Sequence, residues 1–341
     1  MIIVYVLAAL LAFSVLIVGH ELGHFCLAKL NGVKVEEFSI GIFGPKLLSF
    51  KGKETEYSIR AGLIGGCVRM YGEDGEEGNG DSRSFSGKTP LQKLSIIAAG
   101  PLMNVVLAII LFSIVSRGLG YITTTINKVE NNSPAMIAGL QQGDKILKLN
   151  NEDIGSWNEF LEKMSKVENG NESLNLEVQR EEKNLSFDIK PKKQENRYII
   201  GISPSVVKPN FIQSVKNGFT QTWDTTKQTF SFFKTIFKGE MKKDDVGGPI
   251  TMMRLAVKTA SQGVIYLTYF MALISVQLAI FNIIPFPALD GGWIFILLIQ
   301  LITGKKMSDE KIGTINYIGL IVLISLMILI LLKDIISPIK L

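Results

Sequence analysis

Residues 2–26 read IIVYVLAALLAFSVLIVGHELGHFC, an apolar run that ends in His20, Glu21 and His24. No charged residue occurs in 2–19, and about 20 apolar residues suffice for a helix to cross roughly 30 Å of hydrocarbon. The two histidines are the only ones in the 341-residue chain. The stretch therefore predicts a membrane-spanning helix that carries both imidazoles and a carboxylate near its far end.

Charge is segregated along the whole chain. Hydrophobic residues make up 47% of it and charged residues 20%, and three further long runs carry no charge. We therefore predict an α-helical polytopic membrane protein with four transmembrane helices. The expected spans are about 2–28, 94–116, 262–302 and 312–332, and the third is broken near 285 by two prolines.

The positions of the basic residues predict an orientation. Lys29 and Lys34 follow the first span, and Lys88 and Lys93 precede the second. Short loops rich in lysine and arginine face the cytoplasm, which places the N-terminus and the long segment after the second span outside the cell. The net charge of +5 is explained by this topology, and no nucleic-acid partner is expected.

The segment 118–205 is expected to form an inserted extracytoplasmic α+β domain. It contains short alternating strands, a Gly-Asp turn at 143–144 and a helix from about Trp157. The stretch SPAMIAGLQQGDKILKLNNEDI (133–154) resembles bacterial PDZ domains. The resemblance implies a groove that takes an extended peptide by strand addition, and a purely steric gate without a ligand is the open alternative.

Residues 206–258 form the expected linker. Phe211, Phe219, Trp223 and Phe230 recur near helical spacing, with lysines on other faces. Such amphipathic helices lie in a membrane interface or pack on their own protein, and we expect a mixture of the two. The linker separates an N-terminal membrane half, 1–117, from a C-terminal membrane half, 259–341.

His20, Glu21 and His24 form an H-E-x-x-H pattern. Residues i and i+4 project from the same helix face, so both imidazoles can reach one metal ion, and Glu21 lies close enough to accept a proton from an attacking water. Imidazole ligands suit Zn²⁺. Short motifs occur by chance, but ionisable groups inside a membrane are costly and are functional candidates by default.

A catalytic zinc site needs a third protein ligand, and Asp290 is the only acid between 259 and 303. Spans one and three run in the same direction in the predicted topology. His20 lies about 27 Å along the first span, at 1.5 Å per residue, and Asp290 lies near the inner end of the third. Pro285 and Pro287 break that helix, which is tolerated at membrane depth only where the backbone is buried or lines a wet cavity.

Several stretches together resemble the bacterial site-2 proteases, a family of intramembrane zinc metalloproteases. They are the H-E-x-x-H stretch, LDG at 289–291, FSIGIFGPKLLSF at 38–50, YSIRAGLIGGCVRMYGE at 57–73, AAGPLMNVVLA at 98–108 and VGGPI at 246–250. The resemblance covers nearly the whole chain. It implies that Asp290 is the third zinc ligand.

The family resemblance also implies a membrane-associated β-hairpin region at about 38–73, whose edge strand pairs with an unwound substrate. KETEYSIRAGLIGGCVRMYG (53–72) fits two short strands on either side of 62–66. The substrate contacts expected there are Tyr57, Ile59, Gly65 and Gly66. An ordinary cytoplasmic hairpin is the alternative.

Of two asparagines in the apolar runs, only one is expected in the site. Asn282 resembles the family asparagine that bonds the substrate backbone, whereas Asn104 is interpreted as structural because a buried amide can bridge helices. The chain has one PDZ-like module where the best-known Gram-negative members have two. Their scheme for excluding substrates therefore does not transfer directly.

The sequence thus predicts a zinc endopeptidase of a bacterial inner or cytoplasmic membrane, with its active site near the cytoplasmic side. Its expected partners are the lipid bilayer and transmembrane substrates, such as anti-sigma factors or signal-peptide remnants. A non-catalytic PDZ-bearing scaffold is the main alternative, and Glu21 argues against it because binding alone needs no general base. A metal transporter or sensor would need further ligands along a path.

Overall fold

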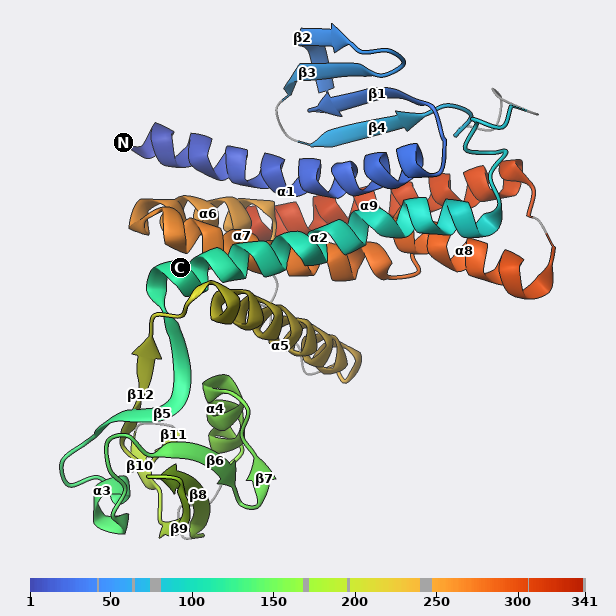
Figure 1. Ribbon diagram of the computed structural model, residues 1–341. Helices are drawn as coiled ribbons and strands as arrows, with labels where there is room; N and C mark the ends of the chain where they lie inside the picture. The colour runs from blue at the N-terminus through green and yellow to red at the C-terminus, as the bar shows by residue number, and fades with distance from the viewer. Residues whose placement is uncertain are drawn as a thin grey trace. The chain divides into compact units, whose positions relative to one another are not determined.

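The computed structural model describes residues 1–41, 43–62, 65–73, 81–167, 172–194, 197–239, 247–305 and 307–339. The chain divides into two compact units (Figure 1). Met1–Val115 and Ser214–Leu341 form a helical unit with a small sheet, and Ser116–Gln213 form an α+β unit. Residues 240–246, and with them the first residue of VGGPI, lie outside the described residues.

In the described part of the helical unit, four helices are long and apolar enough to cross a membrane. These are α1 (Ile2–Leu30), α2 (Pro90–Leu119), α7 (Val264–Ile283) and α9 (Asp309–Ile336), the last over Lys311–Ile336. Apolar side chains of α1, α2 and α7 pack together in one core, where Leu16, Phe112 and Val276 are almost fully buried. The four expected spans are thus present as helices.

The helix is interrupted where the two prolines were expected to break it. The helix α7 ends at Ile283 and a separate apolar helix, α8 (Asp290–Thr303), begins seven residues later. Pro285 and Pro287 lie between them and cannot donate backbone hydrogen bonds. Asp290 consequently occupies the first turn of a helix, where a carboxylate is favoured by the helix dipole.

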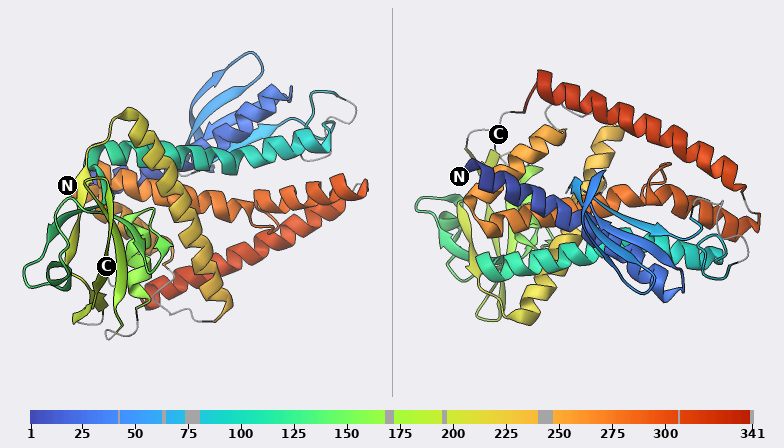
Figure 2. Two further views of the ribbon diagram at one scale, coloured as in Figure 1. Left: turned by 60° about the horizontal axis from the view of Figure 1, so that its bottom comes forward. Right: turned by 90° about the horizontal axis from the view of Figure 1, so that it is seen from above.

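A four-stranded mixed sheet follows α1 and packs on it through β1 and β4 (Figures 1 and 2). Its strands are β1 (Val35–Ile40), β2 (Phe43–Lys51), β3 (Glu56–Gly62) and β4 (Gly66–Met70), in the order β2-β3-β1-β4. Strand β1 pairs parallel to β3 and antiparallel to β4.

The prediction that the two strands on either side of 62–66 form a hairpin is therefore wrong, because these strands do not pair with each other. The strands on either side of 62–66 are β3 and β4, and β1 lies between them. Alternating side chains predict strands but do not name their partners. Here Val35 and Phe38 of β1 join a core shared with α1, where the ring of Phe38 packs against that of Phe25, and the strand takes a central place. Within the described residues, the hairpin is formed by β2 and β3 instead.

Two amphipathic helices connect the α+β unit to α7. They are α5 (Phe211–Phe237) and α6 (Pro249–Gln262). Phe219 and Trp223 of α5 are 63% and 57% exposed, whereas Phe233 packs edge-on against Phe281 of α7. The helix thus has a face that contacts its own protein and an aromatic face that does not.

The α+β unit has its own core. Its sheet runs β12-β5-β6-β8-β9, with β7 beside β6, and a separate pair is formed by β10 and β11. The bounds are β5 (Tyr121–Val129), β6 (Lys145–Leu149), β7 (Glu152–Asp153), β8 (Leu174–Arg180), β9 (Lys183–Ile189), β10 (Lys192–Gln194), β11 (Arg197–Ile199) and β12 (Ile202–Val207), with helices α3 (Pro134–Ala138) and α4 (Trp157–Ser165). Helix α4 begins at Trp157, as expected, because Ser156 caps it by accepting from the backbone of Glu159.

Candidate metal centre

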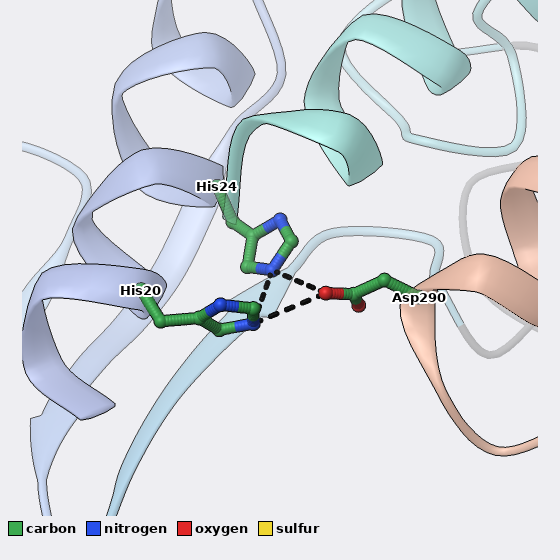
Figure 3. A group of neighbouring side chains, drawn as sticks. All are labelled: His20, His24 and Asp290. Carbon is green, nitrogen blue, oxygen red and sulfur yellow. Dashed lines mark hydrogen bonds and ion pairs between the residues drawn. The ribbon is translucent and has the colours of Figure 1, made fainter. Parts of the chain in front are cut away.

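The structure brings His20, His24 and Asp290 together from three turns of two helices (Figure 3). The Nε2 atoms of the two histidines are 3.2 Å apart. Asp290 Oδ2 lies 3.1 Å from Nε2 of His20 and 3.6 Å from Nε2 of His24. The three atoms thus form a small triangle at the start of α8.

This triangle has the size that a zinc ion needs. Zinc bonds of about 2.0–2.1 Å in a tetrahedron separate neighbouring ligand atoms by about 3.3 Å. The three observed separations, 3.1, 3.2 and 3.6 Å, bracket this value. Asp290 Oδ2 is also buried without a hydrogen-bond partner in the described chain, which is expected of an atom placed to bind a cation. The donor set therefore fits zinc.

A neighbouring carbonyl orients His24. Its Nδ1 lies 2.9 Å from the carbonyl oxygen of Ile96 on α2. A carbonyl can only accept, so the ring proton sits on Nδ1 and Nε2 keeps its lone pair for a metal. This is the tautomer that the triangle requires.

His20 is oriented by Asn104, which is fully buried on α2. The Nδ2 atom of Asn104 lies 3.1 Å from His20 Nδ1, and its Oδ1 is buried without a partner in the described chain. Rotation of the amide exchanges the two atoms, and with Oδ1 toward the ring it accepts the Nδ1 proton and leaves Nε2 as a ligand. The interpretation of Asn104 as only a helix bridge missed this contact.

Helix α2 approaches the imidazoles through a glycine. A Cβ atom on Gly100 would lie 2.2 Å from Nε2 of His24 and 2.7 Å from Cε1 of His20. A Cβ on Gly23 of α1 would lie 2.2 Å from the carbonyl oxygen of Ala99. The two helices can therefore contact each other at the metal centre only with glycine at both positions. In the sequence, the stretch AAGPLMN (98–104) shows this arrangement as Gly100 followed one helical turn later by Asn104.

Glu21 faces the sheet. Its carboxylate lies near the backbone of Val68 on β4. A Cβ on Gly66, at the start of β4, would lie 2.9 Å from Glu21 Cγ, and Gly65 precedes it. Strand β4 is an edge of the sheet. The base expected from the sequence thus lies against an edge strand.

Tyr57 and Ile59 lie elsewhere in the sheet. Both belong to β3, which pairs with β1 on one side and β2 on the other, so strand addition cannot occur there. The ring of Tyr57 packs near those of Phe25 and Phe38. Any contact with substrate from this strand has to come from its side chains, which corrects the edge-strand role expected for these two residues.

Asn282 lies in the last turn of α7, at the entry to the loop that ends at Asp290. Its side chain is half-buried. Its role in holding a substrate stays a prediction.

Apolar helices of membrane-spanning length that carry an H-E-x-x-H pattern, with an acid from a broken helix beside it, define the class of membrane-embedded metallohydrolases. Comparison with known proteins then gives the family. The model of Peptidase family M50 matches residues 8–326, and the chain belongs to this family.

Relatives cover nearly the whole chain. A Clostridium acetobutylicum protein whose name describes it as a zinc metalloprotease is 43% identical over 336 residues, 98% of each chain. The regulator of sigma-W protease RasP of Bacillus subtilis is 29% identical over 415 residues, 97% of this chain and 98% of its own. Zinc metalloprotease RasP of Geobacillus kaustophilus is 28% identical over 413 residues, 97% of each chain. The protein is thus a multi-pass membrane zinc metalloprotease of the site-2 protease family.

Proposed function

We propose that this protease hydrolyses peptide bonds within transmembrane segments of other proteins, with His20, His24 and Asp290 as zinc ligands and Glu21 as general base. One observation carries the proposal. Three ligand atoms lie within 4.8 Å of one another on helices that are otherwise apolar. Such a group is costly inside a membrane unless a metal and a reaction use it.

The residues divide the chemistry between them. When bound, zinc supplies Lewis-acid polarisation of the scissile carbonyl and lowers the pKa of a water ligand. Glu21 takes a proton from the attacking water and delivers it to the leaving nitrogen. The carbonyl of Ile96 and the amide of Asn104 hold the imidazoles, so that neither ring has to reorient during the reaction.

The substrate adds as a strand to the edge of β4. A transmembrane helix hides its peptide bonds within its own hydrogen bonds, and extension along an edge strand exposes them. This edge lies against Glu21 through Gly66, which supports the placement. Gly65, Gly66 and Asn282 hold the extended segment, and main-chain bonds let the site accept varied sequences.

The name of a relative supports the substrate class that we propose. The Bacillus subtilis relative carries the name "Regulator of sigma-W protease RasP". Anti-sigma factors, and remnant signal peptides as a second group of single spans, are the substrates we assign to this chain. The α+β unit is a single PDZ-like domain outside the cell, where it binds or excludes the outer part of a substrate, and the active site lies near the cytoplasmic side.

Substitution of the base tests the reaction. Glu21→Gln keeps the shape of the side chain but cannot accept the proton, so cleavage of a model transmembrane substrate in detergent should fall by at least about a hundredfold. Product formation measured by gel or mass spectrometry gives the rate. Cleavage equal to that of the wild type would remove Glu21 from the mechanism.

Removal of the acid tests the metal centre separately. Asp290→Ala should lower the zinc content of the purified protein, because two imidazoles alone do not complete a catalytic site. Metal analysis after dialysis measures the occupancy. Unchanged occupancy would exclude Asp290 as a ligand, whatever the activity of the variant.

A further inference from the structure

The loop before Asp290 has a strained residue. Ala288 has φ +68°, in the left-handed region that a side chain with a Cβ rarely adopts. Such a conformation persists only where its surroundings impose it. Ala288 lies two residues before Asp290, so the backbone conformation at Ala288 determines the position of the Asp290 carboxylate.

A side chain of α9 holds this residue. The backbone N–H of Ala288 donates to Oδ1 of Asn316 at 3.2 Å. This bond lies at the surface of the helical unit, in the loop between α7 and α8, where the break leaves the N–H without an acceptor in its own helix. Asn316 thus supplies the acceptor that the broken helix no longer provides.

Helix α9 also touches the loop through its backbone. A Cβ atom on Gly319 would lie 2.4 Å from Cβ of Pro287 and 2.7 Å from its carbonyl oxygen. Much of α9 runs along the outside of the helical unit (Figure 2), although near its far end Asp334 accepts a hydrogen bond from Thr251 of α6. Only 6% of its apolar window is buried. Two of the contacts that α9 does make are with the residues just before Asp290: Gly319 lies against Pro287, and Asn316 bonds Ala288.

We propose that Asn316 is a positioning residue for the metal centre, through which the last helix clamps the loop and aims Asp290 at the two imidazoles. The inference rests on the proposed role of Asp290 as a ligand. Without the clamp Ala288 relaxes to an ordinary conformation and the carboxylate leaves the triangle. Losing a supporting contact of this kind weakens metal binding by about 10- to 100-fold.

The test compares five variants of the full chain, four single and one double, in detergent. Zinc affinity is measured by competition with a chelator, and the Co²⁺-substituted protein is followed by visible absorption, which reports ligand geometry independently of activity. Asn316→Leu should weaken zinc binding at least about tenfold and alter the Co²⁺ spectrum. Asn316→Asp keeps an acceptor oxygen and should bind zinc nearly as the wild type does.

Glycine substitutions give a matched pair on the same helix. Gly319→Ala places a methyl group against Pro287 and should reproduce the Asn316→Leu defect, whereas a Cβ on Gly313 would meet nothing within 4 Å and Gly313→Ala should bind zinc normally. If Asn316→Leu does not fold, the comparison of Gly319→Ala with Gly313→Ala still tests whether α9 positions Asp290.

A double variant tests the role of the backbone strain at Ala288. In Ala288→Gly the left-handed conformation costs little, so the double variant with Asn316→Leu should recover part of the lost affinity. Zinc binding by Asn316→Leu within twofold of the wild type, or by Gly319→Ala equal to Gly313→Ala, would overturn the clamp. A wild type that binds no zinc would instead overturn the metal centre, so the two failures are distinguishable.

Discussion

The two imidazoles depend on single contacts from α2. Ile96 contributes a backbone carbonyl to His24, and Asn104 contributes a buried amide to His20. Of the two, only the amide is specified by residue type, because any residue at 96 presents the same carbonyl. A substitution at 104 therefore changes one ligand and leaves the other in place.

Loss of the Asn104 amide is expected to weaken the metal centre without abolishing it. Asn104→Ala leaves His20 Nδ1 without its partner and should reduce zinc affinity about tenfold, measured by chelator competition. Ser275→Ala is the matched control, because Ser275 donates to the backbone carbonyl of Asn104 and not to its side chain. Equal affinities in the two variants would show that the amide does not position His20.

At the scale of elements, the sheet beside α1 is held by a charge cluster as well as by its ladder. Glu37 of β1 is buried, and its Oε1 accepts from Oγ of Ser58 and from the guanidinium of Arg60, both at 2.8 Å. The ammonium group of Lys46 on β2 lies 3.4 Å away. One carboxylate thus joins three strands, which matters because the edge next to Glu21 belongs to the same sheet.

Acid should loosen this sheet. Burial alone would raise the pKa of Glu37, but the hydrogen bonds from Arg60 and Ser58 outweigh burial and hold the pKa below the ordinary 4.5. A carboxyl with a lowered pKa in the folded state stabilises the fold above about 4.5, and this stabilisation is lost as the pH falls through the folded value.

Hydrogen exchange of the β2 and β3 amides between neutral and acidic pH measures this loss. Protection, corrected for the intrinsic rate, should fall below about pH 4.5 in the wild type. Glu37→Gln cannot titrate, so its protection should be lower at neutral pH and should lack the step. A step of the same size in both proteins would assign the acid sensitivity to other groups.

At the scale of the whole molecule, the α+β unit is inserted into a helical one. The chain leaves the helical unit after Val115 and returns at Ser214. The inserted unit has its own core, which includes Ile126, Ile146 and Leu176, all fully buried. Asp144, also fully buried, pairs with Arg180 at 2.6 Å and accepts from the backbone of Gln141.

This unit should fold when it is separated from the helices. A fragment of residues 116–213 is expected to unfold in one cooperative transition, because its core is complete within the unit. Asp144→Asn, which removes the charge opposite Arg180, should lower its free energy of unfolding by about 2 kcal/mol. Denaturant titration followed by circular dichroism measures both, and a fragment without a cooperative transition would contradict the independence of the unit.

Local patterns in the sequence determined the helices and the break. Apolar runs require a helix in a membrane because its backbone bonds are satisfied internally, and the spacing of His20 and His24 puts both on one face. Pro285 and Pro287 end a helix wherever they stand in its interior. The α+β character of the inserted unit and the start of α4 at Trp157 were predictable for the same reason, since a strand pattern and a cap are local.

Only the tertiary structure decided which strands and side chains meet. The place of β1 between β3 and β4 depends on the core under α1, and no alternation of residues records it. The contacts of Asn104 with His20 and of Asn316 with Ala288 join residues 84 and 28 positions apart. Such pairings are set by how helices pack as whole bodies, whereas the sequence specifies mainly what each segment can do by itself.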